Sequence, residues 1–223
     1  MLVSYTEENY LKAIFALSRL YNDAEVSTNQ ISDHLKNKAA SVTDMLKRLS
    51  DKKLIDYKPY KGVKLTDKGK KTAVKVIRKH RLWEVFLVEK LNFKWDEVHD
   101  IAEQLEHIDS DALIEKLDNF LGKPKADPHG DPIPDASGKF GVQRSITLSS
   151  ATQKNNLIVT GVNDHSSEFL KFLSNSGIKL GDHLKIEESN AYDKSLKIKV
   201  NNKQSLFLSH KVASNILVEK NNE

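Results

Sequence analysis

Apolar residues recur at helical spacing over most of the first fifty residues. Residues 6–20 carry an apolar stripe that predicts an amphipathic helix, with Thr6 as its expected N-cap. A second, short helix is predicted to begin at Ser27 or Thr28. A third should run from about residue 41 to 52, where the apolar positions again fall on one face. Three helices separated by short turns predict a helix-turn-helix unit.

Two short strands follow the third predicted helix. Residues 54–59 and 62–66 alternate apolar and polar side chains around a basic turn, which is typical of a β-hairpin. A hairpin directly after a helix-turn-helix is the wing of a winged helix. We therefore expect a winged helix-turn-helix DNA-binding domain over residues 1–75.

Helical periodicity then continues through the middle of the chain. Helices are predicted from about 66 to 91, 95 to 107 and 110 to 121. The segment 122–141 holds four of the five prolines, so it should be a non-helical connector. Residues 76–141 are thus expected to form a helical domain that ends in this connector.

From Ile146 onward the pattern changes to short apolar alternations separated by Gly and Asn turns, with one helical turn near residues 168–173. Residues 142–223 are expected to form a small β-barrel. The predicted fold class is therefore α+β, mostly α.

Composition narrows the range of functions. The 223 residues include no cysteine, which excludes disulfides, thiolate catalysis and Cys-ligated zinc or iron–sulfur clusters. No apolar run approaches the roughly 18–20 residues of a membrane helix, and residues 1–10 do not resemble a signal peptide. We expect a cytoplasmic protein without a membrane partner.

Charge is distributed unevenly along the chain. Residues 36–75 contain thirteen Lys or Arg and four Asp or Glu, whereas residues 84–119 contain three Lys and eleven Asp or Glu. A basic block favours a polyanion partner, and an acidic block with histidines favours a cation site.

The third predicted helix has the features of a recognition helix. Its apolar residues face inward, so its polar residues point outward, where they can contact base edges and phosphates. Lysines of the wing can reach the neighbouring DNA backbone. The alternative is an ordinary solvated lysine face, but the +9 excess favours DNA. The candidate DNA contacts are Lys38, Ser41, Thr43, Asp44, Lys47, Arg48, Lys58, Lys61 and Lys64.

Histidine and carboxylate side chains share helix faces in the acidic block. His80 and Glu84 are four residues apart, and His99, Glu103, Glu106 and His107 fall on a second stripe. Such nitrogen and oxygen donors suit Mn²⁺, Fe²⁺, Zn²⁺, Co²⁺ or Ni²⁺. The alternative is a charged solvent face with local His–Glu pairs. The other five histidines (34, 129, 165, 183 and 210) lack such a grouping and are expected at the surface or in the core.

Signals for an enzyme are weak. The sequence contains no Walker loop, GxGxxG, GxSxG or HExxH motif. A metalloenzyme or metal-storage protein with an incidental basic patch is the main alternative to a regulator, and a metal-independent DNA-binding protein is the third.

Several motifs together resemble the diphtheria-toxin-repressor family of metal-dependent regulators, in its long form with an SH3-like FeoA domain. These motifs are TEENYLKAI, LIDYKPYKGVKLTDKGK, HRLWE, VHDIAEQLEH and PHGDPIP. The resemblance implies a homodimeric, metal-activated repressor that binds a palindromic operator and controls metal-uptake genes.

The resemblance also implies two metal sites per subunit. The primary site would use Glu103, Glu106 and His107, with Asn9 from the first helix. The ancillary site would use His80, Glu84 and His99, completed by Glu168 or the nearby His165. Glu at position 103 favours Mn²⁺ over Fe²⁺. Two departures from the manganese branch are Asn9, where an Asp is usual, and Lys12, where short manganese regulators place a Glu for a second metal.

Overall fold

The structure is a computed structural model that describes residues 3–20, 24–58, 61–142, 144–152 and 156–220. It consists of two compact units. The first comprises Met1–His80, Gln104–Ser110 and Pro134–Lys139, and the second comprises Arg81–Glu103, Asp111–Ile133 and Phe140–Glu223.

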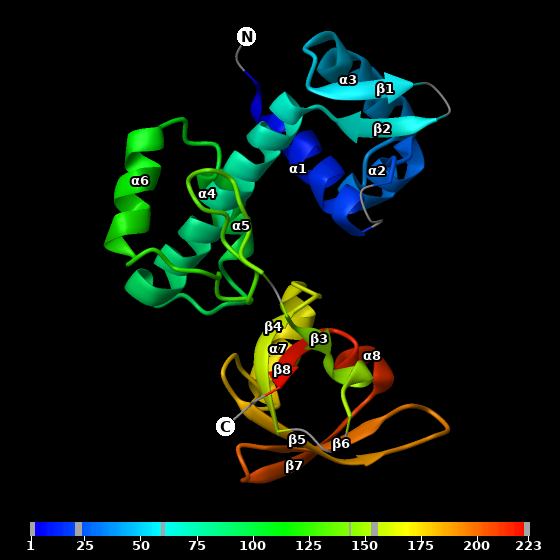
Figure 1. Cartoon of the computed structure of the whole chain (residues 1–223), viewed down its shortest axis with the longest axis vertical. Coiled ribbons are helices and arrows are strands. Elements are labelled where there is room, and N and C mark those ends of the chain that lie inside the picture. The colour runs from blue at the N-terminus through cyan, green and yellow to red at the C-terminus, as the bar shows by residue number, and fades with distance from the viewer. Residues whose placement is uncertain (1–2, 21–23, 59–60, 143, 153–155, 221–223) are drawn as a thin grey trace. The chain divides into compact units, whose positions relative to one another are not determined.

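The first unit contains the expected winged helix-turn-helix (Figure 1). The strands pair antiparallel, from Ile55 opposite Leu65 to Lys58 opposite Gly62. Its elements are α1 (Tyr5–Leu20), α2 (Thr28–Leu35), α3 (Ala39–Asp51), β1 (Ile55–Lys58) and β2 (Gly62–Leu65).

Side-chain caps fix the starts of α1 and α2 in this unit. The sequence predicted that α2 begins at Ser27 or Thr28; Ser27 is its N-cap and forms a reciprocal capping box with Gln30. The cap expected at Thr6 is wrong: α1 begins at Tyr5, and Ser4 and Glu7 exchange side-chain hydrogen bonds with each other's backbone N–H. The reason is spacing, because Ser4 stands three residues before a Glu, whereas Thr6 stands three before Asn9.

A glycine sets the approach of α4 (Asp67–Leu91) to the wing. A Cβ on Gly69 would lie 1.9 Å from the carbonyl oxygen of Leu54, closer than any side chain allows. The first turn of α4 therefore packs directly on the backbone that leads into β1, and the helix continues from the first unit into the second.

The helical part of the second unit consists of α4 from Arg81 onward, most of α5 (His99–Leu105) and α6 (Asp111–Phe120). The helix predicted from residue 95 is wrong at its start, since α5 begins at His99. Residues 95–97 form a turn in which the N–H of Lys94 donates to Glu97 Oε2. This turn lets Trp95 Nε1 donate to Ser174 Oγ at 2.8 Å.

The C-terminal part is a small β domain built on one antiparallel sheet of order β3-β8-β4-β5-β6-β7. Its core is one cluster of buried apolar side chains that includes Leu157, Leu173 and Ile198. The α+β fold class is confirmed. The elements are β3 (Ile146–Thr147), η1 (Leu148–Ser150), β4 (Asn156–Val162), α7 (Ser167–Asn175), β5 (His183–Ser189), β6 (Leu196–Val200), β7 (Gln204–Leu208), α8 (His210–Ala213) and β8 (Ile216–Lys220).

Among the described residues, no helix combines the length and apolar character needed to cross a membrane.

Candidate metal centres and nucleic-acid interface

A buried carboxylate lies at the centre of the first candidate metal site. The Glu106 side chain is fully buried, directly after α5 in the chain. His80 Nδ1 of α4 lies 2.6 Å from Glu106 Oε2. Lys12 Nζ of α1 donates to both carboxylate oxygens, at 2.7 and 2.8 Å. Three segments distant in sequence thus meet at one acidic side chain.

The next residue extends this site toward the start of α1. His107 Nδ1 lies 2.6 Å from Glu8 Oε2, and the His107 ring stacks on Tyr5 at 4.7 Å between centroids. Asn9 Oδ1 is buried and has no hydrogen-bond partner among the described residues. An unsatisfied buried carbonyl oxygen is costly. A metal ion would supply the missing partner, so the donors present fit one.

Burial and neighbouring charges shift the pKa values of Glu106 and Lys79 in this cluster. Burial opposes ionisation of Glu106, but the hydrogen bond from His80 and the charge of Lys12 outweigh it and lower the pKa of Glu106. Burial lowers the pKa of the Lys79 ammonium, which lies near Glu8 and Glu106. The carboxylate of Glu106 is therefore ionised and ready to accept a cation.

The structure brings together most, but not all, of the expected primary ligands. Glu106 and His107 lie against α1, which carries Asn9. Glu103 Oε1 instead lies 3.7 Å from His99 Nε2, and its side chain is 46% exposed. Glu8 was missed by the sequence reasoning, although it stands beside Asn9.

A second cluster lies within the second unit. One ligand atom from each of Glu84, Asp127 and His129 falls within 4.8 Å of the others, and all three residues are buried. His129 Nδ1 lies 3.6 Å from Glu84 Oε2, and His99 Nδ1 lies 3.6 Å from Glu84 Oε1. Asp127 and His129 were not among the expected ligands. The motif PHGDPIP contains His129 and directly follows Asp127, so it was the feature of the sequence that could have indicated these two ligands.

Carboxylates are crowded around the second cluster, and Arg81 pairs with two of them, at 3.5 Å from Asp127 Oδ2 and 2.8 Å from Asp131 Oδ2. Burial, followed by the charges of Glu84 and Asp131, raises the pKa of Asp127 to about 7. Burial disfavours the charged form of His129, but its hydrogen bond to Glu84 and the charges of Glu84 and Asp127 raise its pKa to about 9. Carboxylates crowded in a buried site bind protons or cations tightly, so these donors also fit a divalent ion.

The C-terminal domain contributes a histidine to this neighbourhood. The rings of His165 and His129 stack at 5.0 Å, and burial lowers the pKa of His165. Glu168, the other expected ligand of this domain, is exposed in the first turn of α7. His80, expected in the ancillary set, contacts Glu106. Ligand atoms of His80, Glu84 and His99 also lie within 4.8 Å of one another, so the structure brings these three expected ligands together.

The candidate DNA-contacting residues lie on the exposed side of α3 and the wing. Val42, Leu46 and Leu49 are buried, as expected. Lys47 and Asp44 pair at 3.6 Å with side chains 63% and 71% exposed, and the Thr43 hydroxyl donates to the carbonyl oxygen of Ala39. Lys38, the N-cap of α3, makes no side-chain cap. The exposed members of the set are Lys38, Ser41, Asp44, Lys47, Arg48, Lys58, Lys61 and Lys64.

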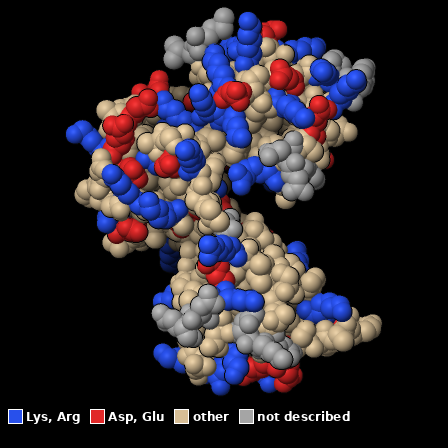
Figure 2. All heavy atoms as spheres, in the orientation of Figure 1, with Lys and Arg blue, Asp and Glu red and all other residues tan. Residues whose placement is uncertain are grey.

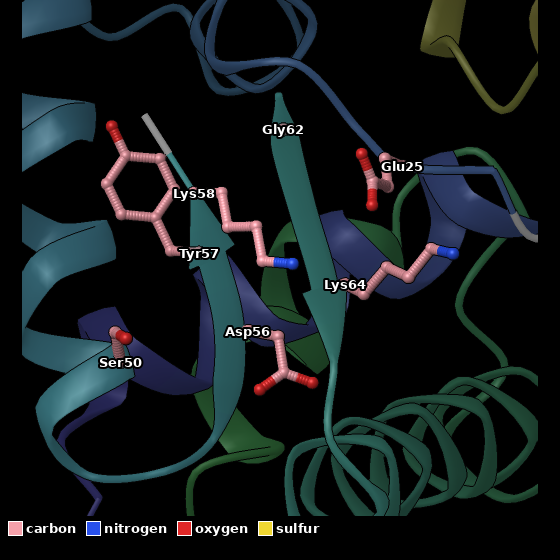
Figure 3. Close-up of a pocket in the computed structure, with 7 residues that line it drawn as sticks. All are labelled: Glu25, Ser50, Asp56, Tyr57, Lys58, Gly62 and Lys64. Atoms are coloured by element: carbon pink, nitrogen blue, oxygen red, sulfur yellow. The ribbon is translucent and has the colours of Figure 1, made fainter. Parts of the chain in front are cut away.

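Acidic side chains interrupt the basic surface around the wing. Figure 2 shows Lys and Arg side chains together with Asp and Glu over the winged-helix part of the chain. A pocket against the hairpin contains Lys58 and Lys64, but also Glu25 and Asp56 (Figure 3). This pocket is therefore charge-balanced, and the uncompensated positive charge lies outside it.

Comparison with known proteins decides the family. Residues 1–63 match the N-terminal DNA-binding domain of iron-dependent repressors, and residues 66–135 match their metal-binding and dimerisation domain. Residues 146–220 match the FeoA domain. An HTH-type transcriptional regulator of Methanocaldococcus jannaschii is 34% identical over 123 residues, which is 55% of this chain and 98% of that protein.

The chain belongs to the diphtheria-toxin-repressor family. The iron-dependent repressor IdeR of Mycobacterium leprae, a family relative, is 26% identical and is aligned over 96% of this chain and 97% of its own length. Among solved structures, a manganese-dependent transcriptional repressor in complex with manganese has a TM-score of 0.84 at 30% identity, covering 96% of this chain and 99% of that one. The manganese regulator SloR has a TM-score of 0.76 at 36% identity, covering 99% and 100%.

Proposed function

We propose that this family member is a Mn²⁺-activated transcriptional repressor of metal-uptake genes, with Fe²⁺ as the alternative activator. The observation that carries the proposal is that Glu106 and His107, in the segment after α5, contact Lys12 and Glu8 of α1, the helix that also carries the unsatisfied oxygen of Asn9. Family membership supports the regulatory role.

Donor chemistry favours manganese. The first cluster offers carboxylate oxygen and imidazole nitrogen from Glu106, Glu8 and His107, and the second offers the same donors; the chain has no cysteine. Carboxylate-rich sites suit Mn²⁺. Similar repressor structures are described with manganese, Cd²⁺ and Zn²⁺.

We infer two sites per subunit. The primary site would use Glu106, His107 and Asn9, with Glu8 or Glu103 as a further carboxylate. The second would use Glu84, either with His80, His99 and Glu168 as the resemblance implied, or with Asp127 and His129. His165 would lie beside the second ion.

Residues of this chain would link metal binding to DNA binding. The bound ion would supply a divalent positive charge that several donors share. Glu106 and His107 would bind the ion from the segment after α5, and Asn9 would bind it from α1. Because α1 packs on α2 and β2 of the winged helix, fixing α1 would favour one arrangement of α3. A bias of a few kcal/mol is enough for such a switch.

A homodimer would place two α3 helices on a palindromic operator, about 34 Å apart. An aromatic surface on α4 and α6 suits the dimer contact. Phe120 is 65% exposed and its ring lies 6.4 Å from that of Phe86, while the buried Trp83 Nε1 has no hydrogen-bond partner among the described residues. Operator binding implies a cytoplasmic protein. A metalloenzyme or storage protein would not need the exposed basic face of α3.

The test is operator binding against free Mn²⁺, measured by fluorescence anisotropy with labelled DNA from the chain's own promoter region. Glu106→Gln and His107→Ala should abolish the metal response while circular dichroism stays unchanged. His183→Ala, an exposed histidine of β5, is the matched control. If the wild-type protein and all three variants bind the operator without metal, the chain is a metal-independent DNA-binding protein and the proposal is refuted.

A further inference from the structure

Lys12 contacts the carboxylate that would bind the proposed metal ion. Its ammonium contacts both oxygens of Glu106, at 2.7 and 2.8 Å. The Glu106 side chain has no exposed surface, whereas the Lys12 side chain keeps 20% of its own. Lys12 therefore reaches from the edge of α1 into the centre of the site.

The contact has the chemistry of a cation-binding interaction. An ionised carboxylate is stable in a buried position only when cations or hydrogen-bond donors compensate it. Lys12 supplies a full positive charge to Glu106, and His80 supplies the second close contact at 2.6 Å. A divalent ion would draw on the same oxygen lone pairs, and two cations so close together repel each other.

We propose that Lys12 is a tethered competitor of the metal ion and so sets the metal concentration at which the protein responds. It compensates Glu106 in the metal-free chain and must release at least one carboxylate oxygen when the ion binds. The flexible lysine stem allows this, because the ammonium can swing toward solvent while its methylenes stay packed. This inference rests on the proposed function, since it requires Glu106 to be a ligand.

An internal comparison separates competition from simple structural pairing. Lys52 contacts Glu7 at 2.7 Å, and the Glu7 side chain is only 7% exposed. This pair also joins α1 to a neighbouring segment through a compensated carboxylate. No histidine contact to Glu7 is found among the described residues, and Glu7 is outside the proposed ligand set. Lys52→Gln is thus the matched control for Lys12→Gln.

The experiment measures Mn²⁺ affinity directly, from the electron paramagnetic resonance signal of free Mn²⁺ in titrations of the full-length protein. Lys12→Gln should bind Mn²⁺ at the primary site about tenfold more tightly, since one opposing charge is removed. Lys12→Arg keeps the charge and should not gain affinity. Lys52→Gln should leave the affinity unchanged, although both Gln variants should lower the melting temperature in chelator.

Unchanged or weaker binding by Lys12→Gln would overturn the inference and make Lys12 an orienting partner of Glu106. If this variant does not fold, Lys12→Met is measured in its place, and a gain in affinity by Lys12→Arg would equally refute competition. Glu106→Gln distinguishes the two proposals. If it removes one Mn²⁺ per subunit, the metal site stands whatever Lys12 does; if it removes none, the proposed function fails.

Discussion

Asn9 is the residue at which a single charge should tune metal binding. Its buried oxygen is available to an ion, but it is neutral. Asn9→Asp keeps the shape of the side chain and adds one negative charge. Mn²⁺ should therefore activate operator binding at a concentration about tenfold lower. The measurement is the Mn²⁺ midpoint in the anisotropy assay.

Asn29→Asp, at an exposed position of α2, is the control for Asn9→Asp and should leave the midpoint unchanged. Equal midpoints for Asn9→Asp and wild type would remove Asn9 from the ligand set.

Gly130 holds the second cluster in place through backbone contact. A Cβ there would lie 2.0 Å from the carbonyl oxygen of Thr160, and its φ is +89°. The adjacent His129 accepts a hydrogen bond from the N–H of Val162 at its carbonyl oxygen. Gly130→Ala should therefore displace His129, lower stability by about 2 kcal/mol or more, and remove one bound Mn²⁺ per subunit.

Gly122→Ala provides the comparison for Gly130→Ala. Its φ is +76°, yet a Cβ there would meet nothing within 4 Å. It should cost only about 1 kcal/mol of backbone strain and keep both ions. Calorimetric melting and metal analysis of the two variants measure this difference; equal metal content would argue against a second site around His129.

At the scale of elements, α3 should carry the electrostatic part of DNA binding. Lys47 and Arg48 are exposed on this helix. Replacing both by Ala should weaken operator binding and reduce the slope of log affinity against log salt by about one for each phosphate that the variant no longer neutralises. Replacing Ser41 should alter sequence preference more than the salt slope, because a hydroxyl can contact a base edge.

Lys171→Ala with Lys185→Ala removes the same charge from exposed positions of α7 and β5. This control should keep the slope of the wild-type protein. A slope that stays constant in the α3 double variant would show that α3 is not the recognition helix.

At the scale of the whole molecule, assembly should depend on the aromatic surface of α4 and α6. Phe120 is 65% exposed, with Lys90 Nζ 5.7 Å from its ring centroid. Phe120→Asp would place a charge in a desolvated contact, so it should raise the dimer dissociation constant at least tenfold. Sedimentation velocity over a concentration series measures this constant.

Tyr192→Asp is the matched control, since Tyr192 is 97% exposed in the C-terminal domain. It should sediment as the wild-type protein does. If Phe120→Asp also does so, the dimer uses another face.

The sequence alone determined the order of the elements. Helical spacing predicted α1, α3 and α4 to within a few residues, because each buries one continuous stripe. The prolines of 122–141 predicted a connector without helix, and short alternations predicted the β domain. The exposed basic positions of α3 followed from the same periodicity, since its apolar residues fix which side faces out.

Only the tertiary structure decided which side chains meet. Spacing along a helix shows that His80 and Glu84 share a face, but it cannot show that His80 contacts Glu106. Helical spacing also cannot show that Asp127 and His129, which lie in the connector, are close to Glu84. The position of His129 depends on the path of the connector and on the close backbone approach of Gly130 to Thr160. Long-range packing of this kind leaves no periodic trace in the sequence, because the partners are set by the fold as a whole.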